Sequence, residues 1–486
     1  MLPTPTYVFD FGDGVTSSVG RVKRTIFAKG QRSDDDHLYG LDDQRLARSL
    51  GRSLPPRMAD LLDIGVASYI ADRLAPRTMP GDSRDINDRW TRRIRLLIPV
   101  REQERWQDES LGRQLERLLG FVTDDQWEIS FRRRVTEPRG SEQQMALSDL
   151  FRDLEPTVML FSGGLDSLLG LFACAQAGCP TLAVSISSTT RLRQLQRDIL
   201  SALRSSGPSR INSAQLGVCL RHASRSRTSQ ETSQRARGFL YAVVGAIAAV
   251  LSGRSRLDVF ENGVGAINLP FTGDQFGAMN SKAVHPYTLA RLTDIFSSVI
   301  GSHFEMSNPA LWQTKGELCQ SLLSLDRLDV VGQTVSCDRY PRQVVNKPCG
   351  CCTSCLLRRL ALRFSGYSDG GKTYAFDPLS EVARWHVHDT LPVFAMRHQA
   401  ERLRRVLSGS NPDHGLLYEF PTLQYVKAAM PQSNSGDISV DERLVRLYRA
   451  YLTEWDEFEA GIPYAAWRGG DIVAIDALSM IGAVAS

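Results

Sequence analysis

Two adjacent glycines separate an apolar run from an amphipathic segment at residues 158–170, which read VMLFSGGLDSLLG. Such a pattern is typical of a buried strand that turns sharply into a helix. The first backbone N–H groups of a helix lack intrahelical partners and carry the positive end of its dipole. Gly163 and Gly164 add no side chain that would block a ligand, and Ser162 and Ser167 add hydroxyl groups. The joint is therefore predicted to bind phosphate.

Asp166 stands next to this predicted anion site, where a carboxylate alone would repel the ligand. A carboxylate beside a polyphosphate indicates a divalent cation between them, and Mg²⁺ on nucleotide phosphates is the common case. The G-x-x-x-x-G-K-[ST] spacing of a Walker A loop is absent from this stretch. Simple capping of the helix by Ser162 or Asp166 is the alternative interpretation. The combination S-G-G-x-D-S between a strand and a helix favours the phosphate site.

A cluster of cysteines follows about 170 residues later along the chain. Cys349, Cys352 and Cys355 form a C-x2-C-x2-C pattern, and Cys337 precedes them. Four thiolates in a tetrahedron suit Zn²⁺ in a structural site. Cys351 is an alternative to Cys352 as a ligand, although the C-x2-C spacing favours Cys352. An iron–sulfur cluster, or a group of unrelated buried or redox-active thiols, remains a competing interpretation.

From residue 156 onward, segments typical of strands alternate with segments typical of helices. This alternation predicts an α/β fold with a parallel sheet, in which ligands bind at the carboxyl ends of the strands. The motifs SGGLDS, SISSTT and ENGVGAIN each lie at such an end. The predicted strands are 157–161, 181–187, 216–220 and 256–262, and the predicted helices are 165–177, 191–205 and 232–252.

The regions on either side of this core have different patterns. A helix is predicted at 58–74 and strands at 94–100 and 127–133, which together indicate an α+β N-terminal region of unknown role. The C-terminal region carries helical periodicity. We therefore predict an α+β domain, an α/β core and a helical extension at residues 1–150, 151–370 and 371–486.

Composition limits the class of protein and of partner. The net charge of +4 is too small to indicate a nucleic-acid-binding face. The longest apolar run, residues 239–251, is too short for a bilayer core, which requires about 20 residues. The N-terminus shows no secretory signal, so we expect a cytoplasmic protein with no membrane partner.

The motif SGGLDS resembles the PP-loop of the N-type ATP pyrophosphatases. Together with the pattern S-C-…-C-G-x-C-x-x-C-x-x-R, it is similar to the 7-cyano-7-deazaguanine synthases, the QueC family. The resemblance covers residues 155–365 and implies a Rossmann-like core of the adenine nucleotide α-hydrolase type. It implies that the loop binds ATP with Mg²⁺ and that four cysteines bind Zn²⁺. The implied ligands are Ser162, Gly163, Gly164, Leu165, Asp166 and Ser167 for ATP, and Cys337, Cys349, Cys352 and Cys355 for zinc.

The resemblance also suggests further site residues. Lys315, in the segment TKGEL, is a candidate phosphate contact and would act in catalysis with Asp166 and Ser167, unless it is an ordinary surface lysine. Arg235 and Arg237 could reach phosphates, although surface arginines are the competing interpretation.

Two other residues after the predicted sheet strands could contact the substrate base. Glu261 and Asn262 close the strand at 256–262 and could read the edge of a guanine-like base, or simply form a loop. His285 precedes Pro286, and we favour a turn residue there over a ligand contact.

The chain departs from the QueC pattern in its length, in the spacing between Cys337 and Cys349 and in the segment after Glu261. Its added terminal regions resemble the QueC-like proteins of bacterial anti-phage defence, in Qat systems (QatC-like) and type IV CBASS. The resemblance implies a ligase that activates 7-carboxy-7-deazaguanine as an acyl adenylate. An amine then forms the amide, and we expect it to be the N-terminal amine of a partner protein.

Three alternatives remain open at this point. The first is 7-cyano-7-deazaguanine (preQ0) synthesis with ammonia as the amine. The second is a PP-loop tRNA-modifying enzyme, which would need a basic RNA-binding face and a reactive cysteine. The third is a nucleotide-binding scaffold that has lost turnover, which the intact Asp166 and its two neighbouring serines argue against.

Overall fold

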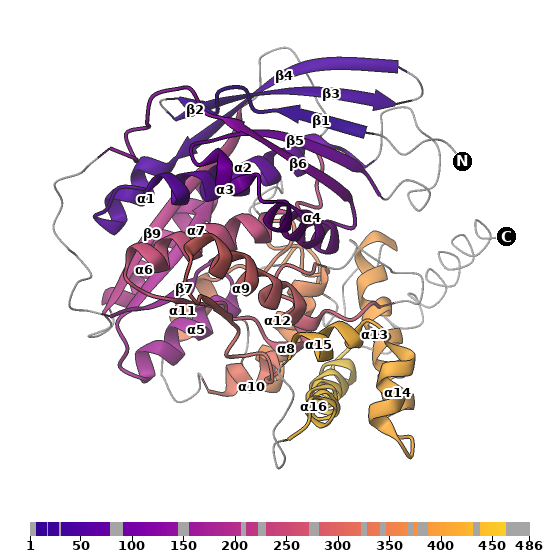
Figure 1. Ribbon diagram of the computed structural model, residues 1–486. Coiled ribbons are helices and arrows are strands. Elements are labelled where there is room, and N and C mark those ends of the chain that lie inside the picture. Colours follow the sequence, from indigo (N-terminus) through magenta and orange to yellow (C-terminus); the bar gives the residue numbers. More distant parts are fainter. Residues whose placement is uncertain are drawn as a thin grey trace.

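The computed structural model describes residues 6–16, 18–28, 31–77, 91–143, 155–205, 210–221, 230–271, 281–321, 328–340, 347–367, 369, 374–377, 387–430 and 438–462. In these residues the protein has an α/β fold, with helices packed against one large mixed sheet (Figure 1). The predicted α/β class is therefore confirmed. The predicted boundary near residue 150 lies outside the described residues.

The sheet has eleven strands, in the order β11-β10-β7-β8-β9-β4-β3-β1-β5-β6, with β2 paired to β3. The strands from β11 to β9 are parallel, as the alternating pattern predicted for β7, β8, β9 and β10. β11 was not predicted. The bounds in sheet order are Glu305–Ser307, Arg256–Asp258, Thr157–Leu160, Thr181–Ser187, Ile211–Arg221, Gln31–Asp42, Val19–Ala28, Thr6–Asp10, Arg93–Val100 and Gln126–Arg133, with β2 at Val15–Thr16.

The strands of the first 150 residues continue the same sheet. β4 pairs antiparallel with β9, with Gly40 opposite Cys219. One apolar core runs through both regions, from Tyr7 to Met306. The N-terminal region therefore shares both sheet and core with the region that carries the glycine loop.

Several elements follow the predicted bounds closely. α2 (Pro56–Leu74), α5 (Leu165–Gln176) and α6 (Thr190–Ser205) confirm the predicted helices. α7 (Arg237–Leu251) begins later than predicted because Gln234 takes a left-handed conformation, φ 49°, that a helix cannot include. β10 is shorter than predicted because the residues after it turn into the short helix α8 (Gly263–Ile267).

The described C-terminal residues are helical, as predicted, and lie together at one end of the molecule (Figure 1). Their apolar side chains form a second core with those of α8 and α12. Residues 463–486 of the predicted extension lie outside the described part. The C-terminal helices are α13 (Val387–Leu407), α14 (Pro412–Glu419), α15 (Leu423–Ala429) and α16 (Val440–Ala460).

The other helices connect the strands or carry parts of the site. They are α1 (Asp43–Leu50), α3 (Gln103–Trp106), α4 (Glu109–Thr123), α9 (Pro286–Ile300), α10 (Lys315–Gln320), α11 (Leu328–Gln333) and α12 (Thr353–Phe364). Among the residues described, none of the helices combines the length and apolarity needed to span a membrane.

Candidate functional site

The glycine loop lies where the order of strands reverses. From β7 the chain proceeds to β8 and β9 on one side, and later to β10 and β11 on the other. The connections that leave the neighbouring strands β7 and β10 therefore diverge, and ligands of parallel sheets bind at such an edge. The loop after β7 carries Ser162–Ser167, and the turn after β10 carries Glu261 and Asn262. The fold thus places two of the predicted motifs side by side at this edge of the sheet.

The loop presents backbone N–H groups at the start of α5. Gly163 has φ +89°, a conformation that residues with side chains rarely adopt. The N–H of Gly164 donates to Ser162 Oγ at 3.2 Å, and the N–H of Leu165 donates to Ser336 Oγ at 3.3 Å. Both N–H groups therefore have hydroxyl acceptors in this structure, and a phosphate at this helix N-terminus would have to replace them.

The predicted loop residues differ in the group that each can offer to a ligand. Ser167 Oγ donates to the carbonyl of Gly164 at 3.0 Å and lies 3.2 Å from Ser162 Oγ, so both hydroxyls line the loop. The side chain of Leu165 is buried in the apolar core, so this residue can serve a ligand only through its backbone.

Asp166 is held by two of the other predicted residues. Lys315 Nζ lies 2.6 Å from Asp166 Oδ2, and the Asn262 side-chain amide donates to Asp166 Oδ1 at 3.0 Å. Both ionic side chains are buried. Burial lowers the pKa of Lys315, but the nearby Asp166 and Glu261 carboxylates outweigh burial, and the net shift is upward. Lys315 is therefore a buried ammonium rather than a surface lysine.

Glu261 brings a second carboxylate to this group. Its Oε1 accepts a hydrogen bond from the Asn262 amide at 2.9 Å, so one asparagine joins both carboxylates. Burial and the charge of Asp166 raise the pKa of Glu261 to about 8, although Lys315 opposes the shift. Above a pH of about 8 both acids are ionised, and their negative charge then exceeds that of the single ammonium. A divalent cation with oxygen ligands would favour this ionised form at lower pH as well. The position of Glu261 beside Asp166 suits a cation ligand as well as the predicted contact with the substrate base.

Arg235 and Arg237 lie at the start of α7. Arg237 is exposed, and within the described residues it has no hydrogen bond or ion pair with the loop. Burial and the neighbouring Arg77 lower the pKa of Arg235, while Asp72 and Asp338 oppose this shift. Asp338 follows Cys337 directly, so Arg235 lies toward the cysteine cluster. Among the described residues, the side chains that hold Asp166 are those of Lys315 and Asn262.

His285 is a helix cap, as the turn interpretation predicted. Its Nδ1 accepts a hydrogen bond from the N–H of Tyr287 at 3.1 Å at the start of α9. The imidazole is buried, and burial together with the Lys282 ammonium lowers its pKa to about 4.

This shift predicts a pH dependence of stability. The neutral imidazole stabilises the fold fully above pH 6.5, and this contribution is lost as the pH falls through about 4. His285→Asn keeps a capping side chain that does not titrate. We expect it to reduce the acid-induced loss of unfolding free energy by about 3 kcal/mol. Urea unfolding between pH 4 and pH 7 measures the difference. Identical pH slopes in the two proteins would contradict the assignment.

The four predicted cysteines come together, and they fit a metal ion. The Sγ atoms of Cys337, Cys349, Cys352 and Cys355 all lie within 4.8 Å of one another, and all four residues are buried. Cys349 Sγ and Cys355 Sγ are 3.9 Å apart. A tetrahedral Zn²⁺ with Zn–S bonds of about 2.3 Å needs Sγ separations of about 3.8 Å. The cluster can therefore hold a metal ion such as zinc, and Cys351 is not part of it.

The sequence around the cluster explains its shape. Gly350 has φ +81°, and a Cβ there would lie 1.9 Å from the carbonyl oxygen of Phe376. The N–H groups of Cys349 and Cys352 donate to Cys337 Sγ at 3.4 Å and Cys349 Sγ at 3.2 Å. Such hydrogen bonds stabilise thiolates that bind a metal. The glycine thus allows the turn that brings the thiols together.

The cysteine cluster and the glycine loop are joined by the two residues before Cys337. The N–H of Val335 donates to the carbonyl of Gly163 at 3.0 Å, and Ser336 Oγ accepts from Leu165. Two hydrogen bonds therefore connect the segment that leads into Cys337 to the glycine loop. Spacing alone did not predict this connection.

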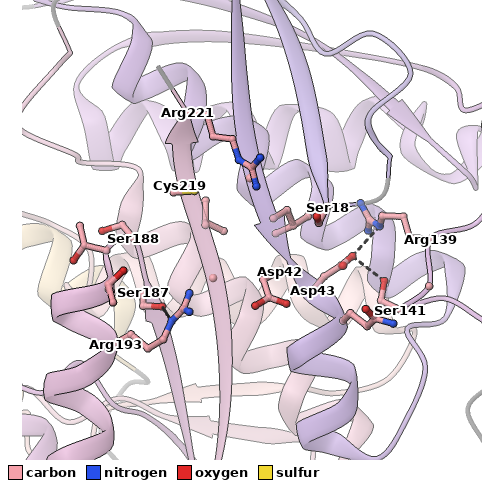
Figure 2. A pocket seen from close by; sticks show the side chains of 18 residues that line it. Ser18, Asp42, Asp43, Arg139, Ser141, Ser187, Ser188, Arg193, Cys219 and Arg221 are labelled. Carbon is pink, nitrogen blue, oxygen red and sulfur yellow. Dashed lines mark hydrogen bonds and ion pairs between the residues drawn. The ribbon is translucent and has the colours of Figure 1, made fainter. Parts of the chain in front are cut away.

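A cavity of about 650 Å³ opens beyond the carboxyl end of β8 (Figure 2). It includes the end of the SISSTT motif, and its size is typical of a ligand-binding pocket. Arg193 and Arg221 line it from α6 and β9, and Asp42 and Asp43 line it from the other side. Neither arginine forms an ion pair with a carboxylate among the residues described.

Glycines in two strands make room for these arginines. A Cβ on Gly217 would lie 3.0 Å from Arg193 Nη2, and one on Gly40 would lie 3.1 Å from Arg221 Nε. Glycine inside a strand often marks a close approach to the sheet. No sequence pattern indicates either arginine as a site residue, because only the fold brings β4, β9 and α6 together.

Comparisons with known proteins leave the family of this chain open. The chain matches no protein-family model, and no curated protein matches it. The residues of the site are therefore the basis of the function proposed next.

Proposed function

We propose that this protein is an ATP-dependent carbon–nitrogen ligase with a PP-loop, similar to QueC. It would activate 7-carboxy-7-deazaguanine and transfer the acyl group to an amine. One observation carries the proposal, namely the convergence of the S-G-G-x-D-S loop with the buried Asp166–Lys315 pair. The linked cysteine cluster supports the deazaguanine branch of the PP-loop enzymes.

In the first step, a substrate carboxylate oxygen attacks the α-phosphorus of ATP and pyrophosphate leaves. The N–H groups of Gly164 and Leu165 and the hydroxyls of Ser162 and Ser167 would bind the leaving pyrophosphate. Lys315 would neutralise part of the charge that develops on it. The product of this step is an acyl adenylate.

In the second step, an amine attacks the acyl carbon, AMP leaves and the nitrogen loses a proton. Asp166, with Glu261 beside it, would hold Mg²⁺, which supplies charge neutralisation at the phosphates. The cysteine cluster would hold Zn²⁺ in a structural role. The cavity beside Arg193 offers space for a further part of the reactants.

We propose the N-terminal amine of a partner protein as the acceptor, in an anti-phage defence system. The helical C-terminal region and the N-terminal strands add much surface around the core, and ammonia needs no docking surface. A protein acceptor uses such a surface, which is the reason for preferring it.

The test uses the full chain with ATP, Mg²⁺ and 7-carboxy-7-deazaguanine, and with either ammonia or a candidate acceptor protein. Pyrophosphate release and the masses of all products are measured. We expect the acceptor mass to rise by that of the deazaguanine acid less one water. Cytosine-type and purine carboxylates serve as matched controls for base recognition.

The outcomes separate the alternatives. A free nitrile from ammonia, without any mass change on a protein, would replace conjugation by preQ0 synthesis. Tight, salt-sensitive binding of tRNA together with no reaction of the deazaguanine acid would favour a tRNA-modifying enzyme. Absence of pyrophosphate release with any carboxylate would overturn the proposed activity.

A further inference from the structure

The C-terminal helix α16 reaches the helix that carries Lys315. The Thr314 hydroxyl donates to the carboxylate of Glu454 on α16, and the same carboxylate lies against the backbone of Gly316, where a Cβ would be 2.4 Å from Glu454 Oε1. Glu454 is 2% exposed and Thr314 is fully buried. A carboxylate from the C-terminal region therefore contacts the residues on both sides of Lys315.

This contact fixes the first turn of α10. Thr314 caps α10 in a capping box with Glu317, and Lys315 is the first helical residue. Gly316 permits the approach of Glu454, because a Cβ there would lie 2.4 Å from Glu454 Oε1. A carboxylate at a helix N-terminus also interacts favourably with the helix dipole. The direction in which Lys315 leaves the backbone thus depends on a side chain far away in sequence.

The same helix supports the second partner of Asp166. Leu447 of α16 packs against Gly263, where a Cβ would lie 2.8 Å from Leu447 Cδ2. Gly263 follows Asn262, which donates to Asp166. α16 therefore contacts both turns whose side chains hold Asp166.

A further ion pair joins α16 to α10 at the surface. The Arg446 guanidinium binds the Glu317 carboxylate and donates to the carbonyl of Trp312 at 2.8 Å. Because these groups are more exposed than Glu454, we assign the ordering of the turn to the buried carboxylate.

We infer that Glu454 is a positioning residue, and that through it α16 sets the position of Lys315 opposite Asp166. This inference rests on the proposed function for its catalytic consequence, but its structural part is independent of it. It assigns a role to the helical C-terminal region, which sequence patterns left without one. Glu454 itself acts only through Thr314 and the backbone of α10.

The test compares Glu454→Leu, Glu454→Gln and the matched control Glu457→Gln, which changes an exposed carboxylate on the same helix. We expect Glu454→Leu to lower kcat for pyrophosphate release about a hundredfold with little change in the KM for ATP, because it displaces a catalytic group. Gln keeps an acceptor for the Thr314 hydroxyl and should restore most of the turnover. Glu457→Gln should match the wild type.

Hydrogen exchange of the intact chain gives a second readout that needs no catalysis. We expect the amides of residues 315–320 to exchange faster in Glu454→Leu, and those of α5 to be unchanged. Gly316→Ala disturbs the same contact, because the added Cβ would collide with the Glu454 carboxylate. It should reproduce both effects, and it takes the place of Glu454→Leu in the test if that variant fails to fold.

Two results would overturn the inference. One is wild-type exchange at residues 315–320 in both Glu454→Leu and Gly316→Ala. The other is faster exchange there with unchanged kcat. If the wild type itself releases no pyrophosphate, the proposed function fails, and exchange alone decides whether Glu454 orders the turn.

Discussion

Asp166→Asn should abolish pyrophosphate release, with a loss of at least about a thousandfold. A cation held by this carboxylate would contribute several kcal/mol to the stabilisation of charge at the phosphates. Asparagine has nearly the same shape, so the hydrogen bond with Asn262 can persist while the charge is lost. Pyrophosphate release at saturating ATP, and ATP binding with and without Mg²⁺, are the measurements.

The substitution also leaves a buried ammonium without its nearest partner. Lys315 lies 2.6 Å from Asp166, and removing one member of a buried pair costs about 3 kcal/mol or more. Glu261 remains nearby, because the Asn262 amide that donates to Asp166 also donates to Glu261. Loss of the Asp166 charge removes one cause of the raised pKa of Glu261 and so favours its ionisation. The fold should therefore survive with a lower unfolding midpoint.

The double variant Asp166→Asn/Lys315→Met separates the two effects. It removes both charges, so it should recover stability relative to Asp166→Asn without recovering turnover. Turnover that recovers along with stability would show that the single variant was inactive only because it was damaged. Full activity in Asp166→Asn would show that the cation, and with it the proposed role of the loop, is wrongly assigned.

The glycine loop and the cysteines could be predicted because their chemistry is local in sequence. Spacing places Gly163 and Asp166 on one strand–helix joint, and Cys349, Cys352 and Cys355 around one turn. The approach of Lys315 to Asp166 was only suggested, since it depends on how α10 packs against the core.

Contacts between distant segments could not be read from patterns. Glu454 has the helical spacing of an ordinary α16 residue, and only the packing of α16 on α10 brings it to Thr314. Likewise, the link from Ser336 to the loop involves two residues with no motif of their own. Such contacts depend on tertiary packing, which overrides local preference.

The sheet shows the same limit on a larger scale. Alternating strands and helices predicted the parallel strands from β7 to β9, because each crossover has a typical length. β4 pairs with β9, so that Gly40 lies opposite Cys219, although the two strands are far apart in the sequence. No local sequence pattern indicates this pairing. The resulting sheet extends from the N-terminal region into the core.

Cys352→Ala should remove the metal from the protein. With one of four thiolates missing, zinc content measured by atomic spectrometry should fall from about one per chain to well below half of that. Structural zinc in small domains contributes about 10 kcal/mol or more to folding, so the unfolding midpoint should also fall. Because Ser336 and Val335 connect Cys337 to the glycine loop, pyrophosphate release should be lost with the metal.

Cys351→Ala is the matched control, since it makes the same change at the neighbouring buried thiol. Cys351 Sγ is not among the four sulfur atoms that lie within 4.8 Å of one another, so this variant should keep its metal and most of its activity. Loss of metal from Cys351→Ala but not from Cys352→Ala would exchange the two ligand assignments.

Iron in place of zinc in the wild type would replace the structural zinc site by an iron–sulfur cluster. If the wild-type protein binds neither zinc nor iron, the four thiols are only a buried cluster, and the proposed coupling between metal and loop is wrong.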